Sequence, residues 1–402
     1  MNTLPSNTTE RRYDLDWLRV LAFFVLIFYH TGQYYVADWG WHIKSETTST
    51  FLQNIMIFTN PWRMSLMFFI SGMALALVIN KYKISTLLQT KLTRILIPFL
   101  FGMFVIVSPQ PYIEFLDQGL INPGFWAFWL EYINPTTQLL AEKQSPIGLL
   151  AWNHLWFLPY LLLYTLITLC IYKPLTKLSE SSRLHHLPLA VPIGFVIITL
   201  IVFRFWLGDR FPTTHDLIND FYNHSKYGLV FFTGFIFAKQ QNWWNSIIQS
   251  RRFFLIIALL TYSFFIADRN MLFPTLAASF SENVSVQVFY RIIGSTNLWF
   301  WLFAVVGYAG HYLNRPSKLL TTANQGILPW YMLHQTVIIM LAWWLKPFTF
   351  NAGIEAILLL LLTISLCLIL YICIERVPLL RFLFGLKLNT PSRLTLNQLK
   401  IS

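Results

Sequence analysis

The sequence predicts an all-α fold: a polytopic membrane helix bundle of about ten transmembrane helices, with the N- and C-termini cytoplasmic. Three observations predict it. The 402-residue chain is 56% hydrophobic and only 11% charged, whereas soluble globular domains carry about 25% charged residues. Apolar runs recur at about the length that crosses a bilayer, and lysine and arginine gather in alternate connections. The composition therefore excludes a soluble enzyme, and an aromatic content of 17% excludes a disordered chain.

The transmembrane helices are expected in ten apolar segments of the chain. The first one is expected to remain as a span, because no small-residue cleavage site of a signal peptide follows it. The third, sixth and seventh have uninterrupted apolar runs shorter than a full crossing, which basic side chains at their ends or burial in the bundle would compensate. The segments are residues 15–35, 62–79, 94–109, 154–172, 187–203, 221–238, 253–267, 296–312, 328–345 and 354–374.

The distribution of charge predicts the orientation of the chain. With the N-terminus inside, the inner segments carry 20 of the 29 lysine and arginine residues, but only 5 of the 17 acidic residues. Cytoplasmic loops retain lysine and arginine, so both ends are expected in the cytoplasm. The same rule explains the net charge of +12 without a nucleic-acid partner. The predicted parts are a cytoplasmic segment (1–14), a membrane domain (15–376) and a cytoplasmic tail (377–402).

Two polar residues in the first segment are the leading site candidates, because charged and imidazole side chains are costly inside a membrane. Arg19 and His30 are eleven residues apart, which is three helical turns plus about 20°, so they share one face about 16 Å apart along the axis. A cation at the inner edge and a base deeper in the membrane suit an extended anionic cofactor that enters from the cytoplasm. The simpler alternatives are an interface anchor beside Asp16 for Arg19, and a buried hydrogen-bonded histidine for His30.

Several short motifs, in order along nearly the whole chain, resemble the acyltransferase 3 family of membrane enzymes. An arginine and a histidine separated by ten residues match Arg19 and His30, and Lys91 stands where the family's basic motif usually has an arginine. Within the family, the sequence resembles the branch that contains glucan biosynthesis protein C. The motifs are residues 15–19 (LDWLR) leading to 28–32 (FYHTG), 68–72 (FFISG), 91–94 (KLTR) with Pro98, 154–158 (HLWFL), 331–335 (YMLHQ) and 375–378 (ERVP).

This resemblance implies an enzyme of the inner (plasma) membrane that transfers an acyl group from acyl-CoA to an extracytoplasmic carbohydrate, with His30 and Arg19 as catalytic residues. Acetyl-CoA and succinyl-CoA are both open as the co-substrate. Transfer to a hydroxyl needs a base that removes its proton, and a neutral histidine can serve near pH 7. Alternatively, His30 takes the acyl group itself as a transient carrier.

The donor is expected to bind at the inner membrane edge, where Arg19, Lys91 and Arg94 lie in the predicted orientation. Coenzyme A carries several phosphate charges, which guanidinium and ammonium groups bind well. For Lys91 and Arg94, the alternative explanation is the ordinary retention of positive charge inside the cell.

Further candidates for substrate binding lie in other segments. Arg63 starts the second segment from the outside, so it could bind an anionic acceptor or stabilise a thioester oxyanion, or reach outer lipid headgroups. Ser71 is a weaker candidate, because Ser71 and Gly72 also suit close helix packing.

The remaining substrate-binding candidates pair an imidazole with a neighbouring polar or aromatic side chain. His154 and Trp156 begin the fourth segment, where they suit sugar stacking or an ordinary aromatic belt. His334 and Gln335 lie inside the ninth segment, where two polar residues are expected to line a cavity.

No metal is expected, because no histidine pair stands at metal-ligand spacing with a carboxylate. The main alternative to an enzyme is a transporter of a glycan or an acyl group, because buried polar residues also line transport paths. A sensor or scaffold is a third class. The sequence contains no convincing internal repeat, which argues against a transporter.

Overall fold

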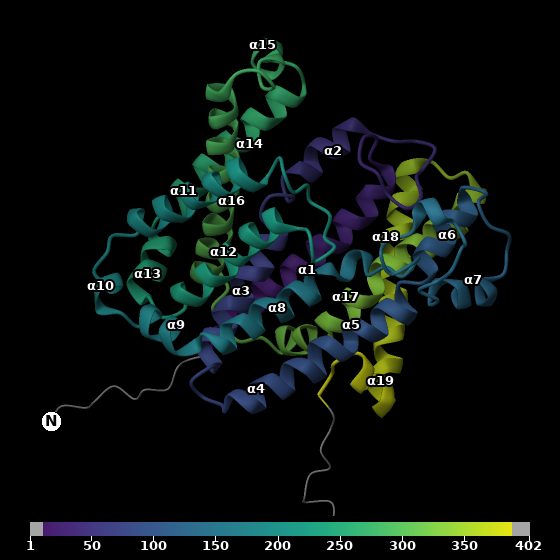
Figure 1. Cartoon of the computed structure of the whole chain (residues 1–402), viewed down its shortest axis with the longest axis horizontal. Helices are drawn as coiled ribbons and strands as arrows, with labels where there is room; N and C mark the ends of the chain where they lie inside the picture. The colour runs from purple at the N-terminus through teal and green to yellow at the C-terminus, as the bar shows by residue number, and fades with distance from the viewer. Residues whose placement is uncertain (1–10, 388–402) are drawn as a thin grey trace, which may run out of the picture. The chain divides into compact units, whose positions relative to one another are not determined.

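The computed structural model describes residues 11–387, and every regular element in this range is a helix. The all-α prediction is therefore confirmed (Figure 1). Most of the predicted cytoplasmic segment at 1–14 and of the tail at 377–402 lies outside the described residues.

Each of the ten predicted segments is helical in the structure. The third is a composite run, Ile84–Asp117, in which α-helical stretches alternate with two π-helical turns, Leu92–Leu96 and Gly102–Ile106. The nine others correspond to the helices α1 (Tyr13–Tyr35), α3 (Arg63–Val78), α8 (Phe157–Cys170), α11 (Ala190–Leu207), α12 (Phe221–Phe237), α14 (Arg251–Arg269), α16 (Val284–Tyr312), α17 (Lys318–Leu345) and α18 (Ala352–Arg376).

Seven helical runs in the described residues are long and apolar enough to cross a membrane, and a bent pair adds an eighth. That pair is α13 (Gln241–Gln249) with α14, which meet at an angle of 64°. Helix α3 is apolar but has only 16 residues. Of the three weakest predicted segments, the third meets the criterion within its 34-residue run, whereas α12 does not. The count of ten spans stays a prediction.

Helices α16 and α17 begin well before their predicted segments, as the composite third run does. Helix α16 starts at Val284 and α17 at Lys318, whereas the apolar runs start near 296 and 328. The additional turns carry polar residues such as Gln287 and Arg291. Hydrophobicity marks the part of a helix that suits a bilayer, and helix propensity lets the same helix continue beyond it.

The chain folds into two compact units, each assembled from two stretches of sequence. Unit 1 contains Met1–Leu88 and Pro159–Asn324, and unit 2 contains Gln89–Leu158 and Gln325–Ser402. Unit 1 thus holds α1, α3, α11, α12, α13, α14 and α16, and unit 2 holds most of the composite third run, together with α6 (Pro109–Asp117), α7 (Phe125–Tyr132), α18 and α19 (Pro378–Leu383).

Within unit 1, α3 and α12 approach each other most closely through two glycines. A Cβ atom added to Gly72 would lie 2.0 Å from the backbone oxygen of Phe231, and one added to Gly234 would lie 2.1 Å from that of Phe69. Small residues allow this backbone approach between helices in a membrane. The prediction that Gly72 serves close packing is confirmed, and the contact holds Arg63, at the start of α3, in a defined place.

Candidate functional site

Arg19 belongs to a polar cluster around the carboxylate of Asp16. Its Nη1 lies 3.3 Å from Asp16 Oδ1 and 3.3 Å from the side-chain oxygen of Asn324, which itself donates to Asp16 Oδ1 at 3.2 Å. Arg11 also binds Asp16, at 2.8 Å. One carboxylate is thus shared by two guanidinium groups, so the cluster keeps a net positive charge.

Helix α1 is uninterrupted from Tyr13 to Tyr35, so Arg19 and His30 share one face as regular helix geometry requires. The exposed apolar residues of α1 are Leu21, Phe24 and Phe28. At 100° per residue, these three lie about 120–180° around the helix from Arg19 and His30. The two candidate side chains therefore project away from the exposed apolar strip of α1.

The ring of His30 is half-buried and oriented by two neighbours. Its Nδ1 lies 2.9 Å from the side-chain oxygen of Gln33, which can only accept, so Nδ1 carries the hydrogen. The neutral ring then has its lone pair on Nε2, the atom that can accept a proton. The ring of Tyr29 meets the His30 ring edge to face, with centroids 5.7 Å apart.

Arg63 is a buried cation beside the same part of α1. Its guanidinium carbon lies 3.4 Å from the centroid of the Tyr29 ring, and the residue is only 7% exposed. Its Nε and Nη1 are buried and have no hydrogen-bond partner among residues 11–387. A buried charge is costly unless it is paired, so this guanidinium is well suited to an anionic ligand.

A second cation that the sequence reasoning missed lies near Arg63. The Nζ of Lys226, on α12, lies 4.7 Å from the ring centroid of Tyr227 and 3.5 Å from its hydroxyl. The ring of Tyr227 packs against Phe68 of α3, with centroids 4.9 Å apart, so Lys226 lies on the helix that packs against the helix of Arg63. The signal was present in the sequence, because Lys226 stands inside a predicted span and is subject to the same rule as Arg19.

A buried carboxylate, Asp220, organises the polar residues at the start of α12. It is fully buried and accepts hydrogen bonds from Tyr160 Oη at 2.5 Å, from Asn223 Nδ2 at 2.8 Å, and from the backbone amides of Thr214 and His215 at 3.2 and 3.1 Å. These four donors satisfy the carboxylate without a basic side chain. Sequence reasoning missed this cluster, because its members come from three separate segments.

In unit 2, Lys91 and Arg94 lie at the first π-helical turn of the composite run. Lys91 ends α4 (Ile84–Lys91), and Arg94 lies within the turn. Pro98, in the helix that follows, has no backbone N–H to donate, and such turns often occur at functional sites. The Nε of Arg94 donates to the backbone oxygen of Gly385 at 3.1 Å. Arg94 therefore holds the segment after α19 in place, in addition to any role toward a ligand.

His154 is buried in unit 2, and its two ring nitrogens have different partners. The side-chain nitrogen of Gln110 donates to Nδ1 at 3.3 Å, and Nε2 lies 3.1 Å from the backbone oxygen of Met332. In this arrangement Nδ1 accepts a hydrogen bond and Nε2 donates one. Trp156 is half-buried in the same short 3₁₀ helix, Asn153–Trp156.

Gln110, which sequence reasoning missed, connects the predicted polar residues of unit 2. Its amide nitrogen donates to His154 and, at 2.7 Å, to Thr336, while its oxygen accepts from Asn153 at 2.9 Å and from Gln335 at 3.1 Å. All four hydrogen-bonding positions of the Gln110 amide are thus occupied.

His334 is fully buried beside His154, with the two ring centroids 5.2 Å apart. Its Nδ1 donates to the backbone oxygens of Trp330 and Tyr331, at 3.2 and 2.8 Å. In the neutral ring the lone pair of His334 is therefore on Nε2.

The structure divides the ten predicted site residues between the two units and groups some of them. In unit 1, Arg63 contacts the neighbour of His30, while Arg19 lies three turns away, and the Ser71 hydroxyl donates to the backbone oxygen of Met67 at 2.7 Å. In unit 2, His154, His334 and Gln335 form one buried group. Unit 1 holds Arg19, His30, Arg63 and Ser71, and unit 2 holds Lys91, Arg94, His154, Trp156, His334 and Gln335.

A metal centre would need several ligating side chains in one place. Within residues 11–387, no three histidine, cysteine, aspartate or glutamate side chains lie where they could hold one metal ion.

Comparisons with known proteins agree with the motifs. The model of the acyltransferase 3 family, described as an acyltransferase domain, matches residues 12–372. Curated relatives named glucans biosynthesis protein C, from Salmonella paratyphi B, Salmonella dublin and Salmonella enteritidis PT4, are 23% identical over 409 residues, and the match covers 96% of each chain. The predicted resemblance is thereby confirmed. No solved structure matches the chain.

Proposed function

Because this chain belongs to the acyltransferase 3 family and is an acyltransferase, we propose that it transfers an acyl group from a coenzyme A thioester to a hydroxyl of an extracytoplasmic carbohydrate. The observation that carries this proposal is the shared face of Arg19 and His30 on α1, opposite the exposed apolar strip. The proposed orientation has both ends of the chain in the cytoplasm, in the inner membrane of the cell.

The donor is proposed to enter at the cytoplasmic end of α1. Asp16 shares its charge between Arg11 and Arg19, so the positive charge that remains can attract the phosphates of coenzyme A. Lys91 and Arg94 are proposed as further phosphate-binding residues. Three turns of helix separate Arg19 from His30, about 16 Å, a length suited to an extended cofactor with its phosphates at one end and its thioester at the other.

At His30, the chemistry is proposed to use Nε2. As a general base, Nε2 takes the proton of the carbohydrate hydroxyl while the hydroxyl oxygen forms a bond to the thioester carbonyl carbon. The carbon–sulfur bond then breaks, and the coenzyme A thiolate leaves and takes up a proton. In the alternative route, Nε2 attacks the thioester, coenzyme A leaves, and the acyl group passes from the histidine to the hydroxyl.

Arg63 and Lys226 are proposed to support this reaction from the other helices of unit 1. A buried guanidinium with two unpaired nitrogens can stabilise the negative charge on the carbonyl oxygen as it forms, and such stabilisation is a large part of many enzymatic rate enhancements. The same charge could instead bind an anionic group of the acceptor. Lys226 would add a second positive charge in either case.

The substrates to test first follow from the relatives and from the chemistry. The relatives are named for glucan biosynthesis, so a glucan is the first acceptor, and acetyl-CoA and succinyl-CoA are the two donors. His154, Trp156, His334 and Gln335 are proposed to bind the carbohydrate, and Ser71 remains a weaker candidate.

The proposal is tested with the purified full chain in liposomes, with glucan and acyl-labelled coenzyme A thioesters. We expect an acyl ester on the glucan with the wild-type protein, and none with His30→Ala. His186→Ala, in a connection of unit 1, is the matched control and should keep full activity. Ester formation by His30→Ala would remove His30 from the mechanism, and movement of label without any ester would favour a transporter.

A further inference from the structure

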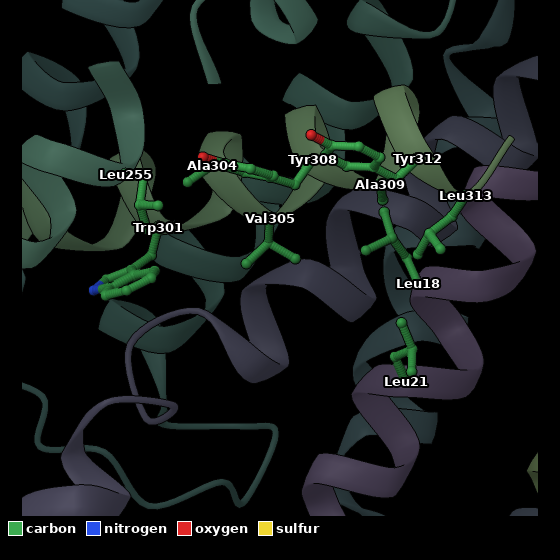
Figure 2. Close-up of a pocket in the computed structure, with 10 residues that line it drawn as sticks. All are labelled: Leu18, Leu21, Leu255, Trp301, Ala304, Val305, Tyr308, Ala309, Tyr312 and Leu313. Carbon is green, nitrogen blue, oxygen red and sulfur yellow. The ribbon is translucent and has the colours of Figure 1, made fainter. Parts of the chain in front are cut away.

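A groove of about 380 Å³ runs along unit 1 between α1, α14 and α16. Its walls are almost entirely apolar side chains, contributed by all three helices (Figure 2). Leu21 comes from α1, Leu255 from α14, and Val305 from α16. Two of these helices, α1 and α16, are long and apolar enough to cross a membrane, so the groove lies along segments that contact lipid chains.

One end of the groove is polar and positively charged. Tyr308 and Tyr312 line this end, and the guanidinium carbon of Arg251 lies 5.8 and 6.0 Å from the centroids of their rings. Arg251 is four residues before Leu255 on α14, so both side chains are on the same face of that helix. The cation therefore stands at the end of the apolar wall that Leu255 helps to form.

Among residues 11–387, no side chain neutralises the charge of Arg251. Its Nη1 donates to the backbone oxygen of Ile248 at 2.7 Å, and its Nε is buried with no hydrogen-bond partner in the described range. In the described part of the chain, no carboxylate lies within 4.0 Å of Arg251, Arg252 or Arg315. Arg315 follows groove residue Leu313 by two positions, so additional positive charge lies near the same end.

From this arrangement, we infer that the groove binds one phospholipid with an anionic headgroup. An acyl chain fills the apolar length between α1 and α16, and the phosphate binds Arg251 beside Tyr308 and Tyr312. Tyrosine is frequent where one side of a ring is apolar and the other meets polar headgroups. The predicted orientation places this end at the cytoplasmic leaflet, where basic residues attract anionic lipids.

This lipid site is separate from the proposed chemistry but adjoins it. Leu18, which also lines the groove, precedes Arg19 on α1. A bound chain would therefore pack against the cytoplasmic half of the helix that carries Arg19 and His30. Lipid binding in the groove does not depend on the identity of the acyl donor or the acceptor, so it can be tested separately from acyl transfer.

The test measures lipid retained by the purified full chain after delipidation, by native mass spectrometry. The protein is exchanged into micelles that contain phosphatidylglycerol or phosphatidylethanolamine. We expect one retained lipid per chain. Both lipids carry the phosphate, but the ammonium of phosphatidylethanolamine is repelled by the cations at this end, so phosphatidylglycerol should bind about tenfold more tightly. Arg251→Gln should abolish this preference, while Arg252→Gln, an exposed neighbour, should keep it.

A second variant and a cross-linking measurement address the apolar wall. Val305→Trp fills the groove and should prevent retention of either lipid, while the protein elutes as wild type in size exclusion. A phospholipid with a photoreactive group at the chain end should label α14 or α16 of the wild type. This labelling tests whether the groove holds a lipid chain even if Val305→Trp does not fold.

Three results would overturn the inference. Equal retention of both lipids by the wild type would mean ordinary annular lipid. An unchanged preference in Arg251→Gln would place the headgroup elsewhere. A protein that forms dimers and protects the groove residues from cross-linking would show that a second copy covers this face.

Discussion

The guanidinium group of Arg63 lies over the ring of Tyr29, with its carbon 3.4 Å from the ring centroid. This contact joins the first residue of α3 to the residue that precedes His30 on α1. Because α3 is itself held against α12 by the contact of Gly72 and Gly234, three helices together determine where this cation stands. The proposed base and the buried positive charge are thus held by the same part of unit 1.

Replacing Arg63 by methionine should separate activity from stability. Methionine keeps the apolar contact with Tyr29 and removes the charge, so acyl transfer should fall by about 100-fold if the charge stabilises an oxyanion. The thermal midpoint should stay the same or rise, because removal of an uncompensated buried charge is not destabilising. Ester formation on glucan and thermal unfolding in detergent measure the two effects.

The control for this variant is Arg210→Met, at an exposed position in the connection before α12. It should leave both quantities unchanged. Full activity in Arg63→Met would show that Arg63 acts only through packing, and a loss of both activity and stability would show that the charge is part of the fold.

Replacing either glycine of the α3–α12 contact should destabilise the protein. A Cβ on Gly72 or Gly234 would overlap a backbone oxygen at about 2 Å, and a backbone atom cannot move aside as a flexible side chain can. Overpacking of this kind costs about 1–3 kcal/mol, so Gly72→Ala and Gly234→Ala should each lower the free energy of unfolding by about this amount.

Gly194→Ala on α11 is the matched control, because a Cβ there meets nothing within 4 Å. It should be neutral or stabilising by up to about 1 kcal/mol. The double variant of Gly72 and Gly234 should cost less than the sum of the two single variants, because separation of the helices relieves both overlaps. Additive losses would argue against one shared contact.

The general fold and the face shared by Arg19 and His30 could be predicted, because both follow from local sequence. Apolar run length identifies the membrane helices, and the 100° turn per residue places two residues of one helix on a common face. Helices α16 and α17, which begin well before their apolar runs, show the limit of the first argument, because polar turns continue a helix without any hydrophobic signal.

The polar groups that surround the candidates could not be predicted, because their members are distant in sequence. Asp220 binds Tyr160, which is 60 residues away, and Gln110 binds Thr336, which is 226 residues away. No pattern in the nearby sequence indicates which distant residues will become such partners. Lys226 is different, because its position inside a predicted span was a local signal that could have identified it.

Replacing Gln110 by leucine should disrupt the polar group of unit 2. The change keeps the size of the side chain but removes the partners of Asn153, His154, Gln335 and Thr336. Each buried group left without a partner costs about 1–3 kcal/mol, so the free energy of unfolding should fall by at least about 2 kcal/mol. Gln118→Leu, at an exposed position at the end of α6, should change stability by less than about 0.5 kcal/mol. Equal effects of the two variants would contradict the proposed network.

The connection between α11 and α12 should make the protein sensitive to acid. Burial lowers the pKa of His215 below its usual value of 6.5. As the pH falls below 6.5, the unfolded chain therefore takes up a proton that the folded protein does not, and stability decreases until the pH reaches the folded pKa. For one group this loss is at most about 1.4 kcal/mol per pH unit.

His215→Asn removes this titration and suits the backbone, because His215 has a φ of 60°, a conformation that asparagine tolerates better than most residues. The variant should lose less stability than the wild type between pH 7 and pH 5, as measured by thermal unfolding in the same detergent. The backbone amide of residue 215 still donates to Asp220, so the fold of the connection should persist. The other histidines are the same in both proteins, so their contribution cancels in the difference. A parallel decline of the two proteins would mean that His215 takes up its proton equally well in the folded and unfolded states.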